Sequence, residues 1–416
     1  MKQKVFLLIA LLSMSLIFSC NKSDDAPSGN SSISFKPIPG KVYTNTSVTV
    51  TGNNFGTDTS KINLRLDSRK MVITAISNES LTFFVPQNFI PWGQKDCTLE
   101  ILREGYTSMQ RQVMVYYAEP AHGWGYGGPL PQNTGFKQLI FPTDSIGYAL
   151  ADRSIYRTTD GGTTWVGDAN NGNFSYGYAI ASSDGLNTWM DYNYQVAVSD
   201  NGTKWTLGVE GRSFDMTIFG LYTAGPANGL VATWGGKLFD VNGSFAGATL
   251  KYQSAQYTTG NYALWAKMSA LDKNNLIIAG FATSKTNIMI LEKAGVFSEV
   301  DISSVSKSAS NVKDLQMVDA NTAYIVDANN ALIKYDGNNW TKLSQAANLV
   351  YFTNATTGYI AYNKKILKTT DGGATWKEEF TLNDDEFVAA LCARNGNVWA
   401  IGSNTKQQGF TVKYKP

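Results

Sequence analysis

The chain has very few of the residues on which many metal, catalytic and disulfide-bonded sites depend. It contains 3 cysteines and 1 histidine, His122, in 416 residues. A metal site built from several histidines is therefore excluded, and a Ser-His-Asp triad has a single candidate base. Cys20 lies in the N-terminal segment, and Cys97 and Cys392 lie in regions that we assign below to different domains. A disulfide framework is not expected, and we predict that Cys97 and Cys392 are buried thiols.

The chain also lacks an excess of charge of either sign. Lys and Arg number 35 against 33 for Asp and Glu, which gives a net charge of +2. This balance gives no electrostatic reason to expect a nucleic acid partner. No glycine-rich phosphate loop, zinc-ligand spacing or EF-hand loop is present, so we expect no metal and no cofactor. Helical periodicity is absent as well, whereas 38 glycines and 21 tyrosines favour sheets with tight turns.

The N-terminus has the features of an export signal. Lys2 and Lys4 precede an apolar run at residues 5–18, and Cys20 follows Ser19. At about fourteen residues the run is too short to span a bilayer comfortably, and the arrangement is typical of a secretory signal. The stretch "LIFSC" resembles the lipobox of bacterial lipoproteins, which implies that Cys20 becomes the lipidated first residue. An ordinary cleaved signal peptide is the alternative.

Residues 20–32, with the polar sequence "NKSDDAPSGNSS" after the cysteine, are predicted to form a flexible tether. The lysine and paired aspartates resemble the surface-export signal of Bacteroidetes lipoproteins. The resemblance implies a lipid-anchored protein in the bacterial outer membrane that faces the exterior, with the membrane itself as a partner through Cys20.

Residues 33–118 contain short alternating runs such as "TSVTVTG", "KINLRL" and "SLTFFVP", separated by turn residues. Several strands at this spacing predict a small antiparallel sandwich. The segment resembles the IPT/TIG family of immunoglobulin-like domains, on the matching residues Pro39, Gly40, Val48, Val50, Gly52, Asn54, Phe55, Gly56, Val85 and Pro86. The resemblance implies a spacer or interaction module without catalytic residues. We expect Trp92, in a loop, to cover one end of the sandwich.

Residues 119–416 repeat themselves. "TTDGGTTW" at 158–165 returns as "TTDGGATW" at 369–376, and strand-like segments recur at intervals of 35 to 48 residues. Seven such units predict a β-propeller, and a six-bladed ring remains the alternative. The expected fold is therefore all-β, with a signal peptide (1–19), a tether (20–32), an immunoglobulin-like sandwich (33–118) and a propeller (119–416).

The repeated phrase resembles the Asp-box, or BNR, repeat. The full copies contain Asp160, Gly162 and Trp165, and Asp371, Gly373 and Trp376. Two weaker copies contain Asp200, Gly202 and Trp205, with the same five-residue step from Asp to Trp, and Asp336 and Trp340. An Asp that enters a tight turn can accept hydrogen bonds from the N–H groups that follow it, and a glycine there can adopt positive φ. With the tryptophan packed beneath the turn, we predict that the repeat is structural.

Asp-boxes also occur in sialidases and other glycosidases, which makes a glycoside hydrolase or lyase the alternative function. The sialidase centre needs three converging arginines, a Tyr–Glu pair and an aspartate. Residues 119–416 contain only Arg153, Arg157, Arg212 and Arg394, so we expect no catalytic residues. Acid pairs for glycoside hydrolysis stay open, because "NDDEF" at 383–387 and Asp191 are present.

A second resemblance favours binding. The run "FPTDSIGYALADRSIYRTTDGGTTW" resembles repeats of the photosystem II assembly factor type, whose propellers act by binding proteins. Four residues that flank the first copy recur at the same offset beside the second: Phe141, Gly147, Tyr148 and Ile155 correspond to Phe352, Gly358, Tyr359 and Ile366.

The candidate ligand-binding residues are four aromatic residues outside the Asp-boxes: Trp124, Tyr126, Trp234 and Trp265. We place Trp124 and Tyr126 in a glycine-rich linker, Trp234 before a Gly-Gly turn and Trp265 in a long insertion. We expect at least one of these rings to be exposed at the channel mouth or the interdomain cleft; packing between blades is the alternative for each. The expected ligand is a polysaccharide or a surface protein, bound by a monomer.

Overall fold

The computed structural model describes residues 32–90, 93–128, 130, 135–152, 154–167, 177–192, 195–207, 214, 217–255, 264–281, 287–308 and 312–416. No helix capable of crossing a bilayer occurs in these ranges. The chain divides into two compact units, of which the second takes in residues 114–416. The sandwich and the propeller are described separately below.

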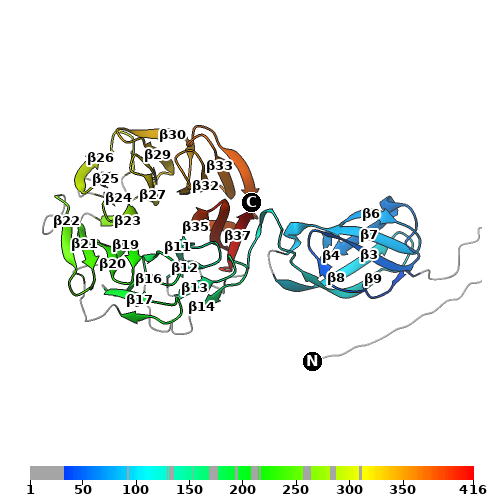
Figure 1. Cartoon of the computed structure of the whole chain (residues 1–416). Helices are drawn as coiled ribbons and strands as arrows, with labels where there is room; N and C mark the ends of the chain where they lie inside the picture. Colours follow the sequence, from blue (N-terminus) through cyan, green and yellow to red (C-terminus); the bar gives the residue numbers. More distant parts are fainter. Residues whose placement is uncertain are drawn as a thin grey trace, which may run out of the picture. The chain divides into compact units, whose positions relative to one another are not determined.

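The sandwich consists of two sheets (Figure 1). One has the order β1 (Ser34–Phe35), β3 (Thr46–Asn53), β7 (Ser80–Val85) and β6 (Val72–Ile76); the other has the order β2 (Val42–Tyr43), β9 (Met109–Tyr116), β8 (Gln94–Arg103), β4 (Ile62–Leu66) and β5 (Arg69–Lys70). Two short 3-10 helices, η1 (Thr59–Lys61) and η2 (Gln87–Phe89), connect strands. Alternate residues point inward as the sequence predicts: Val48 and Val50 are buried between exposed threonines.

The propeller contains seven four-stranded antiparallel sheets within the described residues. Figure 1 shows them arranged as a ring. From inner to outer strand they are blade 1, β11 (Phe136–Ile140), β12 (Gly147–Ala151), β13 (Ser154–Thr158) and β14 (Val166–Gly167); blade 2, β15 (Ile180–Ser182), β16 (Thr188–Tyr192), β17 (Gln195–Ser199) and β18 (Thr206–Leu207); blade 3, β19 (Ile218–Gly225), β20 (Asn228–Thr233), β21 (Lys237–Asn242) and β22 (Thr249–Gln253); blade 4, β23 (Leu264–Asp272), β24 (Asn275–Phe281), β25 (Asn287–Lys293) and β26 (Val296–Asp301); blade 5, β27 (Asp314–Asp319), β28 (Thr322–Val326), β29 (Ala331–Tyr335) and β30 (Trp340–Ala346); blade 6, β31 (Leu349–Phe352), β32 (Gly358–Tyr362), β33 (Lys365–Thr369) and β34 (Lys377–Thr381); and blade 7, β35 (Glu386–Arg394), β36 (Asn397–Asn404), β37 (Gly409–Lys415) and β10 (Gly123–Tyr126).

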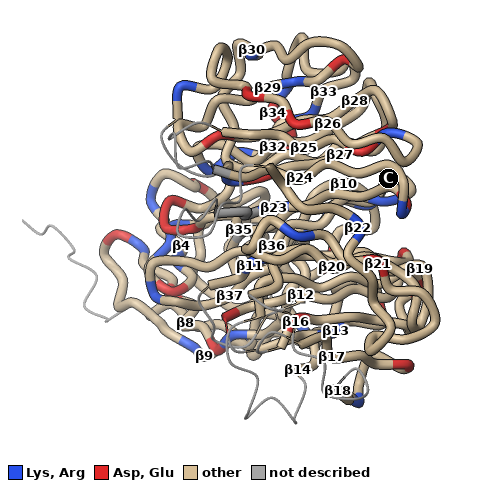
Figure 2. The backbone as a smooth tube through the Cα atoms, turned by 90° about the vertical axis from the view of Figure 1, so that its left-hand side faces the viewer, with Lys and Arg blue, Asp and Glu red and all other residues tan. Residues whose placement is uncertain are grey.

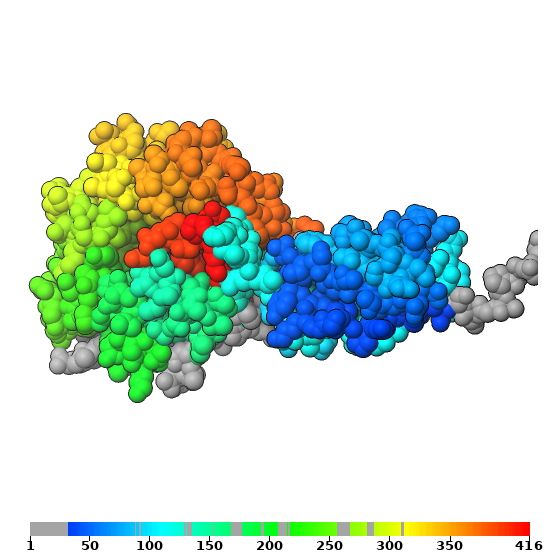
Figure 3. All heavy atoms as spheres, turned by 45° about the vertical axis from the view of Figure 1, so that its right-hand side comes forward, coloured from blue at the N-terminus to red at the C-terminus, as the bar shows by residue number. Residues whose placement is uncertain are grey.

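Blade 7 closes the ring by combining both ends of the propeller segment. Its outermost strand, β10, comes before blade 1 in sequence and pairs antiparallel with β37, so that Gly123 lies opposite Lys415. Figure 3 shows the red C-terminal residues beside the cyan segment that leads into the propeller. The closure settles the number of blades at seven.

Each full Asp-box forms the turn between the third and fourth strands of its blade. Asp160 Oδ1 accepts hydrogen bonds from Thr164 N and from Thr158 Oγ1, both at 2.8 Å, and its Oδ2 accepts one from Thr164 Oγ1 at 2.7 Å. Gly162 has φ +85°, which glycine adopts without steric cost. The corresponding bonds form around Asp371 in blade 6. The turn closes itself as predicted, and it lies between outer strands.

The repeated flanking residues join neighbouring blades. Phe141, at the end of β11, stacks on Trp399 of blade 7 with ring centroids 3.9 Å apart, and it meets the Asp-box residue Trp165 edge-on at 5.9 Å. Trp399 Nε1 also donates a hydrogen bond to the Gly161 carbonyl inside the turn, at 2.9 Å. The Asp-box of blade 1 is therefore a docking point for blade 7.

Blade 6 repeats this arrangement against blade 5. Phe352 stacks on Tyr324 with centroids 3.7 Å apart and meets Trp376 edge-on at 6.0 Å, while Tyr324 Oη donates to Gly372 O at 3.0 Å. Two copies with the same flanks thus mark two blade junctions of the same kind. This is the physical reason that the phrase occurs twice with its neighbours.

The weaker copy in blade 2 differs from our prediction. Asn201, not Asp200, occupies the position of the acceptor: its Oδ1 accepts hydrogen bonds from Thr203 N at 2.9 Å and Lys204 N at 3.0 Å. Ser199 Oγ accepts from Gly202 N at 2.8 Å. The turn is one residue shorter than a full copy, so the five-residue step from Asp to Trp is coincidental there.

The copy in blade 5 does use its aspartate. Asp336 Oδ1 accepts hydrogen bonds from Asn338 N at 3.0 Å and Asn339 N at 2.7 Å.

Cys97 and Cys392 are both buried, as predicted, in the sandwich and the propeller respectively. Basic and acidic positions are scattered along the backbone in the view of Figure 2, in keeping with the near-neutral net charge.

Candidate functional site

A cavity of about 1090 Å³ lies in the channel that the blades enclose. Residues of the first strand of every blade line it: β11, β15, β19, β23, β27, β31 and β35. Adjacent first strands contact each other around the ring. Positions more than 200 residues apart in sequence therefore face one cavity, which is where propellers commonly bind their ligands.

Two polar side chains of the lining form hydrogen bonds with the backbone of a neighbouring blade. Gln138 Oε1 accepts a hydrogen bond from Ile180 N of the next blade at 2.9 Å. Gln316 forms two bonds with the backbone of Phe352, its Nε2 donating to the carbonyl at 2.8 Å and its Oε1 accepting from the N–H. These glutamines hold neighbouring first strands together and are not available to a ligand.

The charged residues of the lining gather at one end of the channel. They are Lys137, Lys267, Lys313 and Asp314. Lys137, Lys313 and Asp314 lie where their inner strands begin, and Lys267 is the first residue of β23 that lines the cavity. Three ammonium groups and one carboxylate thus line this end. We call it the basic mouth and define it by Lys137, Tyr178, Trp234, Lys267, Lys313 and Asp314.

Two aromatic rings lie side by side at the basic mouth. Tyr178, 38% exposed, packs against the half-buried Trp234 with ring centroids 5.5 Å apart. Lys137 Nζ lies 4.1 Å from the centroid of the Tyr178 ring, donates to Gly177 O at 3.1 Å and pairs with Asp152 at 3.0 Å. The tyrosine is therefore covered by a cation as well as by the tryptophan.

A buried carboxylate holds this tyrosine in position. Asp191 is 4% exposed, and its Oδ1 accepts hydrogen bonds from Tyr178 N at 2.5 Å and Ala179 N at 2.7 Å. Burial raises the pKa of the Asp191 carboxyl to about 7, against the opposing effect of these N–H groups and of Lys137. Asp191, a candidate member of a catalytic acid pair, thus binds the backbone N–H groups of Tyr178 and Ala179 at the basic mouth.

Across the channel, both oxygens of the Asp314 carboxylate accept hydrogen bonds, whereas the ammonium group of Lys267 has no such bond among the described residues. Asp314 accepts hydrogen bonds from Leu315 N at 3.0 Å and Val350 N at 2.8 Å, one on each oxygen. Burial raises the pKa of Asp314, and nearby Lys267 acts in the opposite direction. The half-buried Lys267 makes no hydrogen bond and no ion pair with the residues that the structure describes.

Asp314 is the single carboxylate among the described lining residues, whereas glycoside hydrolysis ordinarily uses a pair of carboxylates about 5–10 Å apart. The described part of the chain also holds no group of three or more His, Cys, Asp or Glu side chains suited to a metal ion.

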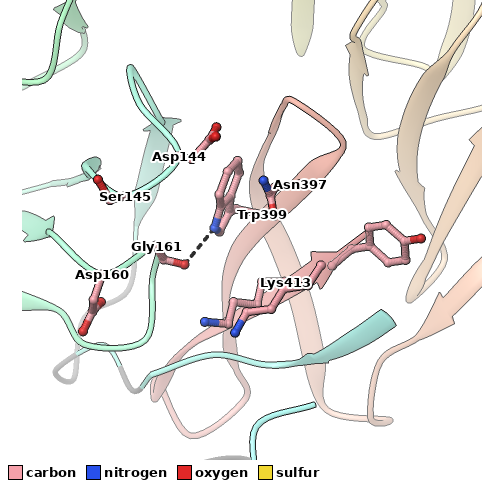
Figure 4. A pocket seen from close by; sticks show the side chains of 9 residues that line it. Asp144, Ser145, Asp160, Gly161, Asn397, Trp399 and Lys413 are labelled. Atoms are coloured by element: carbon pink, nitrogen blue, oxygen red, sulfur yellow. Dashed lines mark hydrogen bonds between the residues drawn. The ribbon is translucent and has the colours of Figure 1, made fainter. Parts of the chain in front are cut away.

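A second pocket, of about 300 Å³, lies beside the Asp-box of blade 1 (Figure 4). Its side chains are already engaged: Trp399 bonds to Gly161 O, as the dashed line shows, and Lys413 Nζ donates to Thr163 Oγ1 at 2.8 Å and pairs with Glu119. Both Trp399 and Lys413 are buried. This pocket is part of the junction between blades 7 and 1.

Two of the predicted ligand-binding residues belong to the blade interior. Trp124 and Tyr126 lie in β10, the outer strand of blade 7, and not in a linker. Trp124 packs among Tyr359, Phe380 and Tyr414, at centroid distances of 6.4, 5.6 and 5.5 Å. Tyr126 is 3% exposed. Their placement in a linker is wrong, because pairing with β37 makes this segment a strand. Packing of the rings within the blades, the alternative stated for each, is what the structure shows for these two.

The other two have different positions. Trp234 lines the channel at the basic mouth, although it is half-buried rather than exposed. The backbone of Trp265 lies in β23, opposite Gly280, and so belongs to a strand rather than to an insertion loop; its side chain lies outside the described residues. Cys20 and Trp92 also lie outside the described residues.

Sequence reasoning missed Tyr178, Lys137, Lys267 and Lys313. The available signal was positional: Tyr178, Lys137 and Lys313 lie at or just before the beginning of an inner strand, and Lys267 lies within β23 where the strand starts to line the cavity. The repeat spacing locates these beginnings, but it does not tell which of them carry ligand-binding side chains.

Comparison with known proteins agrees with this architecture. Residues 31–115 match the model of the IPT/TIG domain. No curated protein sequence matches the chain. Among solved structures, the chain is similar to YCF48 bound to D1 peptide, with 13% identity and a TM-score of 0.58 over 72% of this chain and 99% of that one.

YCF48 from Cyanidioschyzon merolae gives 15% identity and a TM-score of 0.57 over 71% of this chain and 99% of that one. The WD40 β-propeller domain of Doa1 gives 10% identity and a TM-score of 0.51 over 70% and 97%. At these identities the likeness concerns the fold. The chain thus combines an IPT/TIG domain of immunoglobulin-like fold with a seven-bladed β-propeller.

Proposed function

We propose that the protein is a non-enzymatic, lipid-anchored surface protein that binds a polypeptide segment of a partner protein at the basic mouth of its propeller. The IPT/TIG domain acts as a spacer, and the lipid on Cys20 holds the protein in the outer membrane. The proposal rests chiefly on one observation: Tyr178, Trp234 and Lys267, whose side chain forms no ion pair among the described residues, line one end of a single cavity.

The likeness to a propeller solved with a bound peptide supports a polypeptide as the ligand. The rings of the mouth support it as well. One side of Tyr178 is taken by Lys137, and Trp234 packs against both Tyr178 and the apolar core of blades 3 and 4. Such rings offer edges and a hydroxyl to a peptide, and little free flat surface on which a sugar ring can stack.

The test is a comparison of ligand classes on the full-length protein. A random peptide array and a glycan array are probed with the wild type and with Trp234→Ala and Tyr178→Ala. We expect peptides that bind the wild type and bind both variants at least about tenfold more weakly, as truncation of a buried aromatic contact does. Glycans that depend on the same two residues would favour the polysaccharide alternative, and cleavage of a glycan by the wild type would favour an enzyme.

Anchoring is tested separately through Cys20. In cells supplied with a labelled fatty acid, Cys20→Ala is expected to lose the label and to leave the membrane fraction, because the thiol is the proposed acylation site. Cys97→Ala is the matched control and should keep the label. Labelling of the Cys20 variant at the wild-type level contradicts the anchor.

A further inference from the structure

The lysines of the basic mouth differ in how far their charge is already satisfied. Lys137 pairs with Asp152 at 3.0 Å. Lys313 is exposed, and its ammonium group donates one hydrogen bond within the described residues, to the neutral side chain of Asn330 at 2.5 Å. Lys267 has no hydrogen bond or ion pair within the described residues. Within the described residues, two of the three cations therefore form no ion pair, although Lys267 is near enough to Asp314 to act on the pKa of its carboxyl.

The two lysines without an ion pair lie on neighbouring blades. Lys267 belongs to β23 and Lys313 directly precedes β27, and these two inner strands are adjacent in the ring. The Ser269 hydroxyl accepts a hydrogen bond from Met317 N at 2.9 Å, which fixes the two strands relative to each other. Both lysines line the same cavity.

Asp314 is a single carboxylate beside two lysines, so it can offset at most one of their charges. Each of its oxygens already accepts a backbone N–H, from Leu315 and Val350. Burial raises the pKa of its carboxyl, and the positive charge of nearby Lys267 opposes that shift. The local balance is an excess of positive charge in a half-buried setting, where a charge–charge interaction is screened less than on an open surface.

The geometry points to Lys267 and Lys313 as the recognition site for a carboxylate of the bound polypeptide, either an acidic side chain or a C-terminal carboxylate. The inference rests on the proposed function and specifies the ligand chemistry at the same site. Lys267 supplies the half-buried contact and Lys313 the exposed one. Tyr178 and Trp234, from blades 2 and 3, contact the apolar part of the same segment.

The test uses the full-length protein and a fluorescent poly-glutamate decapeptide, with poly-glutamine and polygalacturonate as companions, at low salt. Wild type is expected to bind poly-glutamate and not poly-glutamine. Lys267→Gln should weaken binding about tenfold, and Lys313→Gln should weaken it less and flatten its dependence on salt, because exposed charges are screened more strongly. Lys267→Arg should restore most of the affinity. Lys342→Gln is the matched control, because Lys342 is an exposed lysine on β30, outside the cavity lining.

The outcomes separate this inference from the proposed function. Poly-glutamate binding that is unchanged in Lys267→Gln overturns the carboxylate site. So does preferential binding of polygalacturonate, which would assign the cations to an acidic glycan. If array peptides bind in a Trp234-dependent manner but poly-glutamate does not, the site for a polypeptide stands and its acidic specificity fails. The Arg variant guards against misfolding, since a fold defect would not be rescued by restoring only the charge.

Discussion

At the scale of single residues, the Asp-box acids give the propeller a defined sensitivity to acid. Bonds from Thr375 Oγ1, Thr375 N and Thr369 Oγ1 hold the pKa of Asp371 at about 2. Because the folded pKa lies below the unfolded value of 3.8, ionised Asp371 stabilises the fold above about pH 4. That stabilisation is lost as the pH falls from about 4 towards 2. We expect the melting temperature of the wild type to fall more steeply over this interval than that of Asp371→Asn.

The control for that measurement is Asp200→Asn, because Asp200 makes no hydrogen bond through its side chain within the described residues. It should follow the wild-type profile. Identical acid profiles for wild type and Asp371→Asn would show that the turn does not depend on the charge of the aspartate.

The shorter turn of blade 2 yields a second residue-level prediction. Asn201 Oδ1 accepts the N–H groups of Thr203 and Lys204, so Asn201→Ala leaves two turn donors without their acceptor. We expect a loss of about 1 kcal/mol in the free energy of unfolding, since both donors are solvent-accessible. Asp200→Ala should change it by less than about 0.5 kcal/mol. Urea unfolding of both variants measures the two losses. A larger loss for Asp200→Ala than for Asn201→Ala would show that Asp200 is the acceptor of the turn.

At the scale of elements, the start of β32 requires a glycine, because Gly358 lies directly against the ring of Phe352. A Cβ placed on Gly358 would lie 2.5 Å from ring atoms of Phe352, whose ring is fixed between Tyr324 and Trp376. Gly358→Ala must therefore displace the stacked ring, and we expect a cost of about 1–3 kcal/mol. Gly225→Ala is the control, because a methyl group added there would have no atom within 4 Å. Equal stability of the two variants in thermal unfolding would contradict the role of this stacking.

The elements also show what the sequence can and cannot reveal. Alternating residues such as Val48 and Val50 predict the sandwich, and the spacing of the repeats predicts seven blades, because both patterns are local. The strand β10 could not be predicted in this way, because its partner β37 lies about 290 residues away and only that pairing makes it a strand. The basic mouth escapes it for the same reason. Tyr178 and Lys267 become neighbours of one cavity only when the ring closes.

At the scale of the whole molecule, closure of the ring concentrates polar contacts at blade 7. Tyr126 Oη donates to the buried Glu386 Oε2 at 2.5 Å, and Asn383 Nδ2 donates to Tyr126 Oη at 2.8 Å and to Glu386 Oε1 at 3.0 Å. The pKa of the Tyr126 hydroxyl is raised, first by burial and then by Glu386, so that the hydroxyl remains a donor. These bonds join β10, the first strand of the propeller in sequence, to the beginning of β35.

Tyr126→Phe tests whether this residue closes the ring or binds a ligand. The variant keeps the ring packed against Phe380 and Phe410 but removes a donor from the carboxylate of Glu386, which is 4% exposed. We expect the free energy of unfolding to fall by about 1–3 kcal/mol, the contribution of one hydrogen bond to a charged group, since Asn383 N still donates to the same oxygen at 3.0 Å. Peptide binding at the basic mouth should be unchanged, because Tyr126 does not line that cavity. Calorimetric unfolding combined with the peptide array distinguishes the two roles: a variant with wild-type stability and lost binding would return Tyr126 to the ligand site, and would show that closure depends on the β10–β37 backbone pairing alone.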